Sequence, residues 1–164
     1  MNLPNKKNSD YPRLRSVEAK HIADLIRIGE ETSLSPWSAQ SYLEEIKNPV
    51  AVMLRLVGED NSTIGFIVGR LVTGGEIETQ ADAEIYNIAV IEREQKKGRG
   101  QSLLDAFAKI CREKQAVNIW LEVRESNIKA IRFYERNGFE RIQSRRNFYE
   151  NPREHALLMK FMLK

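Results

Sequence analysis

An apolar run followed by a basic, glycine-containing turn stands in the middle of the chain, and this order is typical of an anion-binding site. The run covers residues 84–91, and the turn contains Gly98 and Gly100. Glycine lets the backbone approach a ligand closely, and the first turn of a following helix leaves amide N–H groups without intrahelical partners. The positive end of the helix dipole would also attract a phosphate. Basic residues around the turn are Arg93, Lys96, Lys97 and Arg99. We therefore expect a phosphorylated cofactor at this turn.

The glycines alone leave two interpretations open. A glycine pair after a strand is often only a tight connection, and basic residues near a loop often only face solvent. The turn lacks the later glycine of a dinucleotide-binding fingerprint and the Gly-Lys-Ser/Thr ending of a P-loop. The spacing Gln95-x-x-Gly98-x-Gly100 after residues 87–90 instead resembles the coenzyme A pyrophosphate loop of the GNAT superfamily of N-acetyltransferases. The resemblance implies acetyl-CoA bound by Ile88, Ala89, Val90, Gln95, Lys96, Lys97, Gly98, Arg99, Gly100, Gln101 and Ser102.

A second motif, within residues 118–139, makes this resemblance more specific. It reads Trp120-Leu121-Glu122-Val123-Arg124, then Ser126-Asn127, Ala130, Phe133-Tyr134 and Gly138-Phe139. Acetyl transfer needs an unprotonated amine that attacks the thioester, a donor for the developing oxyanion and a proton for the departing thiolate. By resemblance, Glu122 accepts the amine proton directly or through water, and Tyr134 is the general acid. Asn127 would hold the pantetheine arm. No covalent enzyme intermediate is required.

Within the superfamily, the chain most resembles bacterial enzymes that acetylate the N-terminal alanine of a ribosomal protein. The resemblance is carried by residues 87–90, 120–127, 145–149 and 36–38. It implies direct transfer from acetyl-CoA to a protein α-amine, with a small-subunit ribosomal protein as partner. Trp37 and Tyr149 are candidate acceptor contacts. Ser35 and His155 depart from the pattern, so the acceptor stays open.

Each of these assignments has a plainer alternative. Glu122 could be a solvated carboxylate at a strand end, Tyr134 could fill the core, and Asn127 could only cap a helix. Trp37 and Tyr149 are also credible packing residues. The enzyme could acetylate lysine, a small-molecule amine or aminoacyl-tRNA on the same scaffold. In another class, the chain would be a non-catalytic CoA-binding module or a nucleic-acid-binding one.

Length and composition favour one folded domain. The chain has 164 residues, of which 30% are charged and 41% hydrophobic, and its formal net charge is +3. This modest excess does not indicate nucleic-acid binding. Cys111 is expected to be a buried structural thiol, and His21 and His155 lack the spacing of a metal site, so we predict no metal. With no apolar signal segment and no run of transmembrane length, we expect a cytoplasmic protein without a membrane partner.

Hydrophobic periodicity predicts an α/β (α+β) fold, and the GNAT resemblance places it in residues 12–164 after a flexible extension, residues 1–11. We expect a central, mainly antiparallel mixed sheet flanked by helices, with the cofactor where strands ending near Val90 and Arg124 separate; that separation is implied by the resemblance. Predicted strands are 12–17, 50–57, 63–72, 83–91, 117–124, 139–148 and 155–163. Predicted helices are 18–31, one capped by Ser38 and ending near 47, one beginning at 102, and one capped by Ser126 or Asn127 and ending near 137. Residues 73–82 and 149–153 are expected connections.

Overall fold

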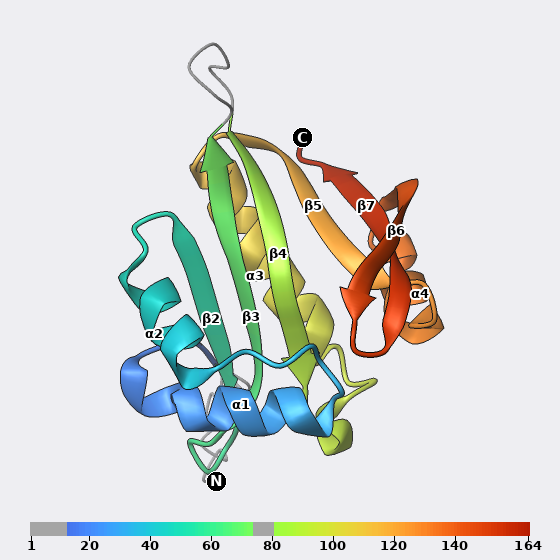
Figure 1. The fold of residues 1–164 in the computed structure, drawn as a ribbon. Coiled ribbons are helices and arrows are strands. Elements are labelled where there is room, and N and C mark those ends of the chain that lie inside the picture. The colour runs from blue at the N-terminus through green and yellow to red at the C-terminus, as the bar shows by residue number, and fades with distance from the viewer. Residues whose placement is uncertain (1–12, 74–80) are drawn as a thin grey trace, which may run out of the picture.

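The computed structural model describes residues 13–73 and 81–164, which form one seven-stranded sheet with helices on both faces (Figure 1). Its strands, in chain order, are β1 (Arg13–Ser16), β2 (Ala51–Val57), β3 (Thr63–Thr73), β4 (Ala81–Val90), β5 (Ala116–Arg124), β6 (Glu140–Glu150) and β7 (Arg153–Met162). The order across the sheet is β1-β2-β3-β4-β5-β7-β6. Neighbouring strands are antiparallel except β4 and β5, which are parallel. The predicted mainly antiparallel mixed sheet is confirmed.

Different helices cover the two faces of the sheet. The helices are α1 (Ile22–Glu31), α2 (Ala39–Lys47), α3 (Arg99–Glu113) and α4 (Ile128–Arg136), with short 3-10 turns η1 (Ala19–His21) and η2 (Glu92–Glu94). In Figure 1, α1 and α2 lie in front of the sheet and α3 behind it. Tyr42 of α2 meets Phe66 of β3 with 6.3 Å between ring centroids. On the other face, a Cβ on Gly69 would lie 2.6 Å from the ring of Phe107 in α3. Apolar layers therefore cover both faces.

Most predicted elements are present, with ends displaced by a few residues. The predicted Ser38 cap is confirmed, because its Oγ accepts a hydrogen bond from the Ser41 amide at 3.0 Å. The predicted helix at 18–31 begins as the 3-10 turn η1 and becomes α-helical at Ile22. The predicted connection at 149–153 is wrong in extent, because Tyr149↔Glu154 and Glu150↔Arg153 are paired in the sheet. Cross-strand pairing therefore outweighs the local turn residues here.

Two predicted segments fall partly or wholly outside the described residues. The expected extension at 1–11 lies outside them, as does most of the expected connection at 73–82. Thr73 pairs with Ala81, so the strands on either side of that connection are longer than predicted.

Cys111 is fully buried, and burial raises the pKa of its thiol to about 12, as expected for a structural cysteine.

A buried ion pair joins α2 to β3 and provides a test of the fold. Glu45 is 1% exposed and accepts hydrogen bonds from Arg70 Nε at 2.9 and 3.0 Å, and another from Nη2. The hydrogen bonds to Glu45 raise the pKa of Arg70. Removing Arg70 would leave a buried carboxylate unpaired. Because the Arg70 side chain is 40% exposed, we expect Arg70→Ala to lower the free energy of unfolding by about 2 kcal/mol, less than for a fully buried pair.

Chemical denaturation measures this loss. The matched control is Arg27→Ala, since the Arg27 pair with Asp24, at 3.5 Å, is solvent-exposed on both sides. That variant should lose less than about 1 kcal/mol. Equal losses in the two variants would show that the Glu45 pair contributes no more than a surface pair.

Candidate active site

β4 and β5 separate near the centre of the sheet and leave an opening between them. Their parallel pairing ends at Ile85↔Leu121, yet β4 continues to Val90 and β5 to Arg124. The predicted separation of these strands is therefore confirmed. Along this edge of β4, backbone groups of residues 88–90 have no β5 partner, which suits the contact with pantetheine that the resemblance implied.

A β-bulge bends β4 at the point where its pairing with β5 stops. Val68 of β3 pairs with Asn87. The next residue of β3, Gly69, pairs with Ile85, so Tyr86 is the extra residue on β4. Bulges bend the strand that carries them and increase its twist. The opening is therefore built into the register of β3 and β4.

The predicted glycine turn is present, but its helix begins earlier than expected. Gly98 is the N-cap of α3 and has φ +76°, in the left-handed region that favours glycine. The helix begins at Arg99 and not at residue 102, so Gly100 lies in its first turn. The Ser102 amide is bonded to the Gly98 carbonyl at 3.0 Å. The preceding amides, at 99–101, have no intrahelical acceptor and suit an anion.

The space beside Gly98 is open, and the charges around it are partly balanced. A Cβ built on Gly98 would meet no atom within 4 Å. The carboxylate of Glu94 pairs with Lys97 and Arg99, each at 3.2 Å. Hydrogen bonds from Arg99 and then Lys97 hold the pKa of Glu94 below its ordinary value. Glu94 therefore holds two of the predicted cofactor residues beside the helix N-terminus.

Gln95 connects the turn to α4 through contacts within the protein. Its Nε2 donates to the Val90 carbonyl at 2.8 Å, and its Oε1 accepts a hydrogen bond from Lys129 Nζ. Both ends of the amide are thus engaged, and its role toward the cofactor stays a prediction. Lys129 was not singled out in the sequence, because a contact across 34 positions leaves no local signal.

α4 carries two of the predicted residues in different environments. Asn127 caps the helix, accepting a hydrogen bond from the Ala130 amide at 3.1 Å, and its contact with pantetheine stays a prediction. Tyr134 is 7% exposed and packs between Phe133 and Phe139, each with 5.4 Å between ring centroids. Burial raises the pKa of the Tyr134 hydroxyl, and Tyr149 raises it further. The phenol therefore stays protonated, as a proton donor must.

The structure brings Glu122 and Tyr149 into contact, and Tyr149 acts electrostatically on Tyr134 of α4. Glu122 is the first β5 residue beyond the last pair with β4, and its carboxylate pairs with Arg145 of β6. Tyr149 Oη lies 3.4 Å from the Glu122 carbonyl, to which it donates a weak hydrogen bond. Burial raises the pKa of Tyr149, and the charge of Glu122 raises it further. Tyr149 thus interacts electrostatically with both proposed catalytic side chains.

Trp37 and Glu122 lie on the same face of the sheet. The Trp37 ring contacts Tyr86 with 5.9 Å between centroids, and Tyr86 donates a hydrogen bond to Glu84 at 2.8 Å. Glu84 pairs with Trp120, and strand alternation puts Glu122 on the same face as Trp120. The face covered by α1 and α2 therefore presents the aromatic pair from one side of the opening and the carboxylate from the other. Tyr86 was not predicted as a site residue.

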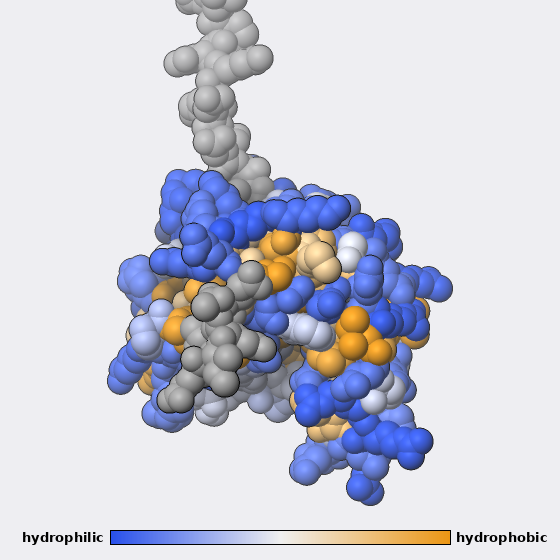
Figure 2. Space-filling model, turned by 90° about the horizontal axis from the view of Figure 1, so that it is seen from above, coloured by the Kyte–Doolittle hydropathy of each residue, from blue (hydrophilic) through white to orange (hydrophobic). Residues whose placement is uncertain are grey.

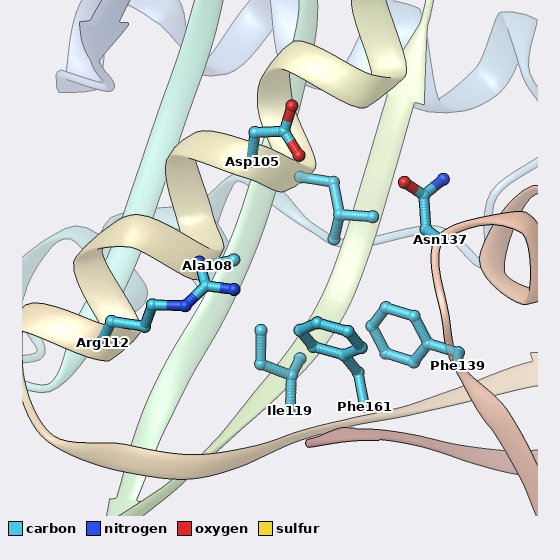
Figure 3. Close-up of a pocket in the computed structure, with 8 residues that line it drawn as sticks. Asp105, Ala108, Arg112, Ile119, Asn137, Phe139 and Phe161 are labelled. Carbon is cyan, nitrogen blue, oxygen red and sulfur yellow. The ribbon is translucent and has the colours of Figure 1, made fainter. Parts of the chain in front are cut away.

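A separate pocket of about 230 Å³ lies between α3, β5 and the chain that follows α4 (Figure 3). It is lined by Leu104, Asp105, Ala108, Arg112, Ile119, Asn137, Phe139 and Phe161. The last two rings stack with 5.4 Å between centroids, while Asp105 and Arg112 project from α3. The pocket is smaller than the about 300–1,000 Å³ of usual ligand sites, and its lining includes none of the predicted site residues.

The two histidines have structural partners. His21 Nδ1 accepts a hydrogen bond from the Glu18 amide at 3.0 Å, and His155 Nδ1 accepts one from the Asn147 amide at 3.1 Å. Within residues 13–73 and 81–164, no group of three or more His, Cys, Asp or Glu side chains is placed to hold a metal ion. No helix in that part of the chain has the length and apolarity to span a membrane. Seen from above, hydrophilic residues cover most of the surface, with smaller hydrophobic groups between them (Figure 2).

Comparisons with known proteins support the fold. A sequence model described as the acetyltransferase (GNAT) family matches residues 21–139. The chain is 39% identical over 148 residues to a ribosomal protein bS18-alanine N-acetyltransferase of Escherichia coli K12, covering 89% of this chain and 94% of that one. It is 30% identical over 166 residues to an N-alpha-acetyltransferase of Saccharolobus solfataricus, covering 97% and 98%. A crystal structure of the E. coli ribosomal-protein-S18-alanine N-acetyltransferase superposes with a TM-score of 0.78 at 25% identity, covering 93% and 94%.

Proposed function

The chain belongs to the acetyltransferase (GNAT) family, and on this premise we propose that it transfers the acetyl group of acetyl-CoA to the α-amine of a protein N-terminus. The preferred acceptor in this proposal is the N-terminal alanine of a small-subunit ribosomal protein. The observation that carries it is the opening between β4 and β5, because Glu122 lies at its edge and Tyr134 interacts with Tyr149 beside it.

The cofactor is proposed to lie along the face that α3 covers. Its pyrophosphate would accept hydrogen bonds from the amides of residues 99–101, with Lys96 and Lys97 adding positive charge. The pantetheine arm would follow the edge of β4 at residues 88–90, where β5 no longer pairs and Gln95 holds the Val90 carbonyl. Asn127 Nδ2 would hold the arm from α4. This path carries the thioester from the helix N-terminus to the opening.

At the opening, the proposed reaction is a direct attack of the amine nitrogen on the thioester carbonyl carbon. The N–C bond forms, the C–S bond breaks, and the sulfur leaves as a thiolate. Glu122 takes the proton that the amine loses, and Tyr134 gives a proton to the sulfur. Backbone amides of β4 beside Val90 would stabilise the oxyanion. Trp37 and Tyr149 would line the acceptor side.

An α-amine suits this arrangement better than a lysine side chain at neutral pH. The pKa of a peptide α-amine is about 7.7–8.0, whereas that of lysine is about 10.4. At neutral pH a much larger fraction of an α-amine than of a lysine amine is therefore already unprotonated, so less proton removal is left to Glu122. The names of both relatives support an N-terminal acceptor, and the one at 39% identity supports alanine of bS18.

Acceptor profiling tests the proposal. The purified protein is incubated with acetyl-CoA and three peptides of equal length: one starting with alanine, one with the same sequence and a blocked N-terminus, and one with blocked N-terminus and several lysines. Mass spectrometry locates the acetyl group. We expect transfer to the first peptide only. Transfer mainly to lysines, or no transfer to any peptide, would contradict the proposed acceptor.

A further inference from the structure

Asn87 has a buried polar group without a partner. The residue is 5% exposed, and among the described residues no atom forms a hydrogen bond with its Nδ2. Buried side-chain amides are nearly always hydrogen-bonded, because losing water without gaining a partner is unfavourable. A buried donor left unbonded beside an opening therefore suggests that a ligand completes it.

The register of the sheet places this donor on the acceptor side of the opening. Asn87 pairs with Val68 across β3 and β4, so their side chains share a face. Strand alternation puts Phe66 on that face as well, and its ring contacts Tyr42 of α2. Trp37 and Tyr86 lie on this face. The N-terminus of α3, where the pyrophosphate is proposed, lies on the opposite face. Asn87 thus faces the acceptor side and not the cofactor side.

Asn87 also lies at a suitable position along the strand. It follows the bulge at Tyr86 and is the second residue after Ile85, which makes the last pair with β5. Glu122 is the first residue beyond that pair on the other strand. The amide of Asn87 and the carboxylate of Glu122 are therefore presented from opposite sides of the same opening, on the same face.

We propose that Asn87 Nδ2 donates a hydrogen bond to the carbonyl oxygen of the first acceptor residue while the α-amine of that residue faces Glu122. The proposal rests on the N-terminal acetyltransferase function proposed above. In a peptide, this carbonyl is attached to the carbon that bears the α-amine. In a lysine side chain, only methylene groups occupy the corresponding positions. Asn87 would thus be a specificity residue that selects α-amines over ε-amines.

The test removes the donor from the enzyme and the acceptor oxygen from the substrate. Kinetics are measured for an alanine-starting peptide and for its analogue in which an alkene replaces the first peptide bond. The wild-type protein should prefer the amide peptide by about 10- to 100-fold in kcat/KM. Asn87→Leu and Asn87→Asp should lose most of this preference, mainly through a fall in activity on the amide peptide. The Kd for acetyl-CoA should stay the same.

Thermal unfolding separates a ligand-binding role from a structural one. A donor that has no partner in the protein stabilises nothing, so Asn87→Leu should keep or raise the Tm. The control is Asn118→Leu, because Asn118 Nδ2 donates to Asp82 at 2.9 Å. That variant should lower the Tm without changing the preference between the two peptides.

Failure of this inference differs from failure of the proposed function. If the wild-type protein acetylates neither peptide, the N-terminal acetyltransferase proposal fails. If it acetylates the alanine peptide but both Asn87 variants keep the wild-type preference, the role of Asn87 is refuted. A raised Kd for acetyl-CoA in these variants would place the donor on the cofactor, and a lowered Tm in both would make it structural; either result overturns the inference.

Discussion

Replacing Tyr134 by phenylalanine should lower kcat for acetyl transfer about 100-fold while leaving the Kd for acetyl-CoA within about two-fold of the wild-type value. The phenol is proposed to protonate the departing thiolate, a step that phenylalanine cannot perform. A thiolate is a fairly stable leaving group, so we expect the low end of the range for general acid catalysis. Stopped assays for kcat and titration calorimetry for Kd measure the two effects separately.

The environment of Tyr134 also predicts the shape of the pH profile. Burial raises the pKa of its hydroxyl above the ordinary value of about 10, so the phenol remains protonated throughout pH 6 to 9. The wild-type rate should therefore rise with deprotonation of the acceptor amine and should not fall again within this range. A descending limb below pH 9 would argue against Tyr134 as the acid.

A matched control separates chemistry from packing. Tyr42 is also buried, at 2% exposed, and burial raises its pKa to about 12, but it lies on the other face of the sheet under α2. Tyr42→Phe should keep kcat near the wild-type value. If Tyr134→Phe is as active as Tyr42→Phe, Tyr134 is a core residue and the proton reaches the sulfur by another route.

Local patterns were sufficient to predict where the site elements lie. Ser38 precedes a helical repeat and has a side chain that caps it, and Gly98 follows a strand at a position that requires a left-handed backbone. Both signals arise within a few residues, so they can be read from the sequence. The misplaced helix start at Gly100 is also a local matter. This glycine was assigned to the turn, although glycine is compatible with the first turn of a helix.

Features that depend on distant pairing were not predictable in this way. The bulge at Tyr86 results from how β3 and β4 pair, and nothing within residues 84–91 marks which residue is extra. Arg145 lies in a segment that carries the family resemblance, but its contact with Glu122 spans 23 positions and leaves no local signal. The unpartnered amide of Asn87 becomes visible only when all its neighbours are placed. The sequence motif therefore located the strand, while the geometry of the site required the fold.

Replacing Glu122 by glutamine should lower kcat about 100- to 1,000-fold, because an amide of the same shape cannot accept the proton of the attacking amine. The effect should fall on kcat and kcat/KM alike, as expected for an interaction made in the transition state. If the carboxylate only attracts the positively charged acceptor, replacing it would instead raise KM and leave kcat unchanged. Initial rates over a range of peptide concentrations distinguish these outcomes.

The fold should tolerate this change, so the loss of activity can be attributed to chemistry. The pair between Arg145 and Glu122 is partly solvated, with side chains 48% and 25% exposed, and such pairs contribute about 0–1 kcal/mol to stability. Glu125→Gln is the matched control, because Glu125 lies just beyond β5 and accepts a hydrogen bond from Ser144. It should keep near wild-type kcat.

At pH 9 most α-amines are already unprotonated, given their pKa of about 7.7–8.0. A deficit of Glu122→Gln that persists there would assign the carboxylate to proton removal during attack, whereas full recovery would limit it to deprotonating the acceptor beforehand.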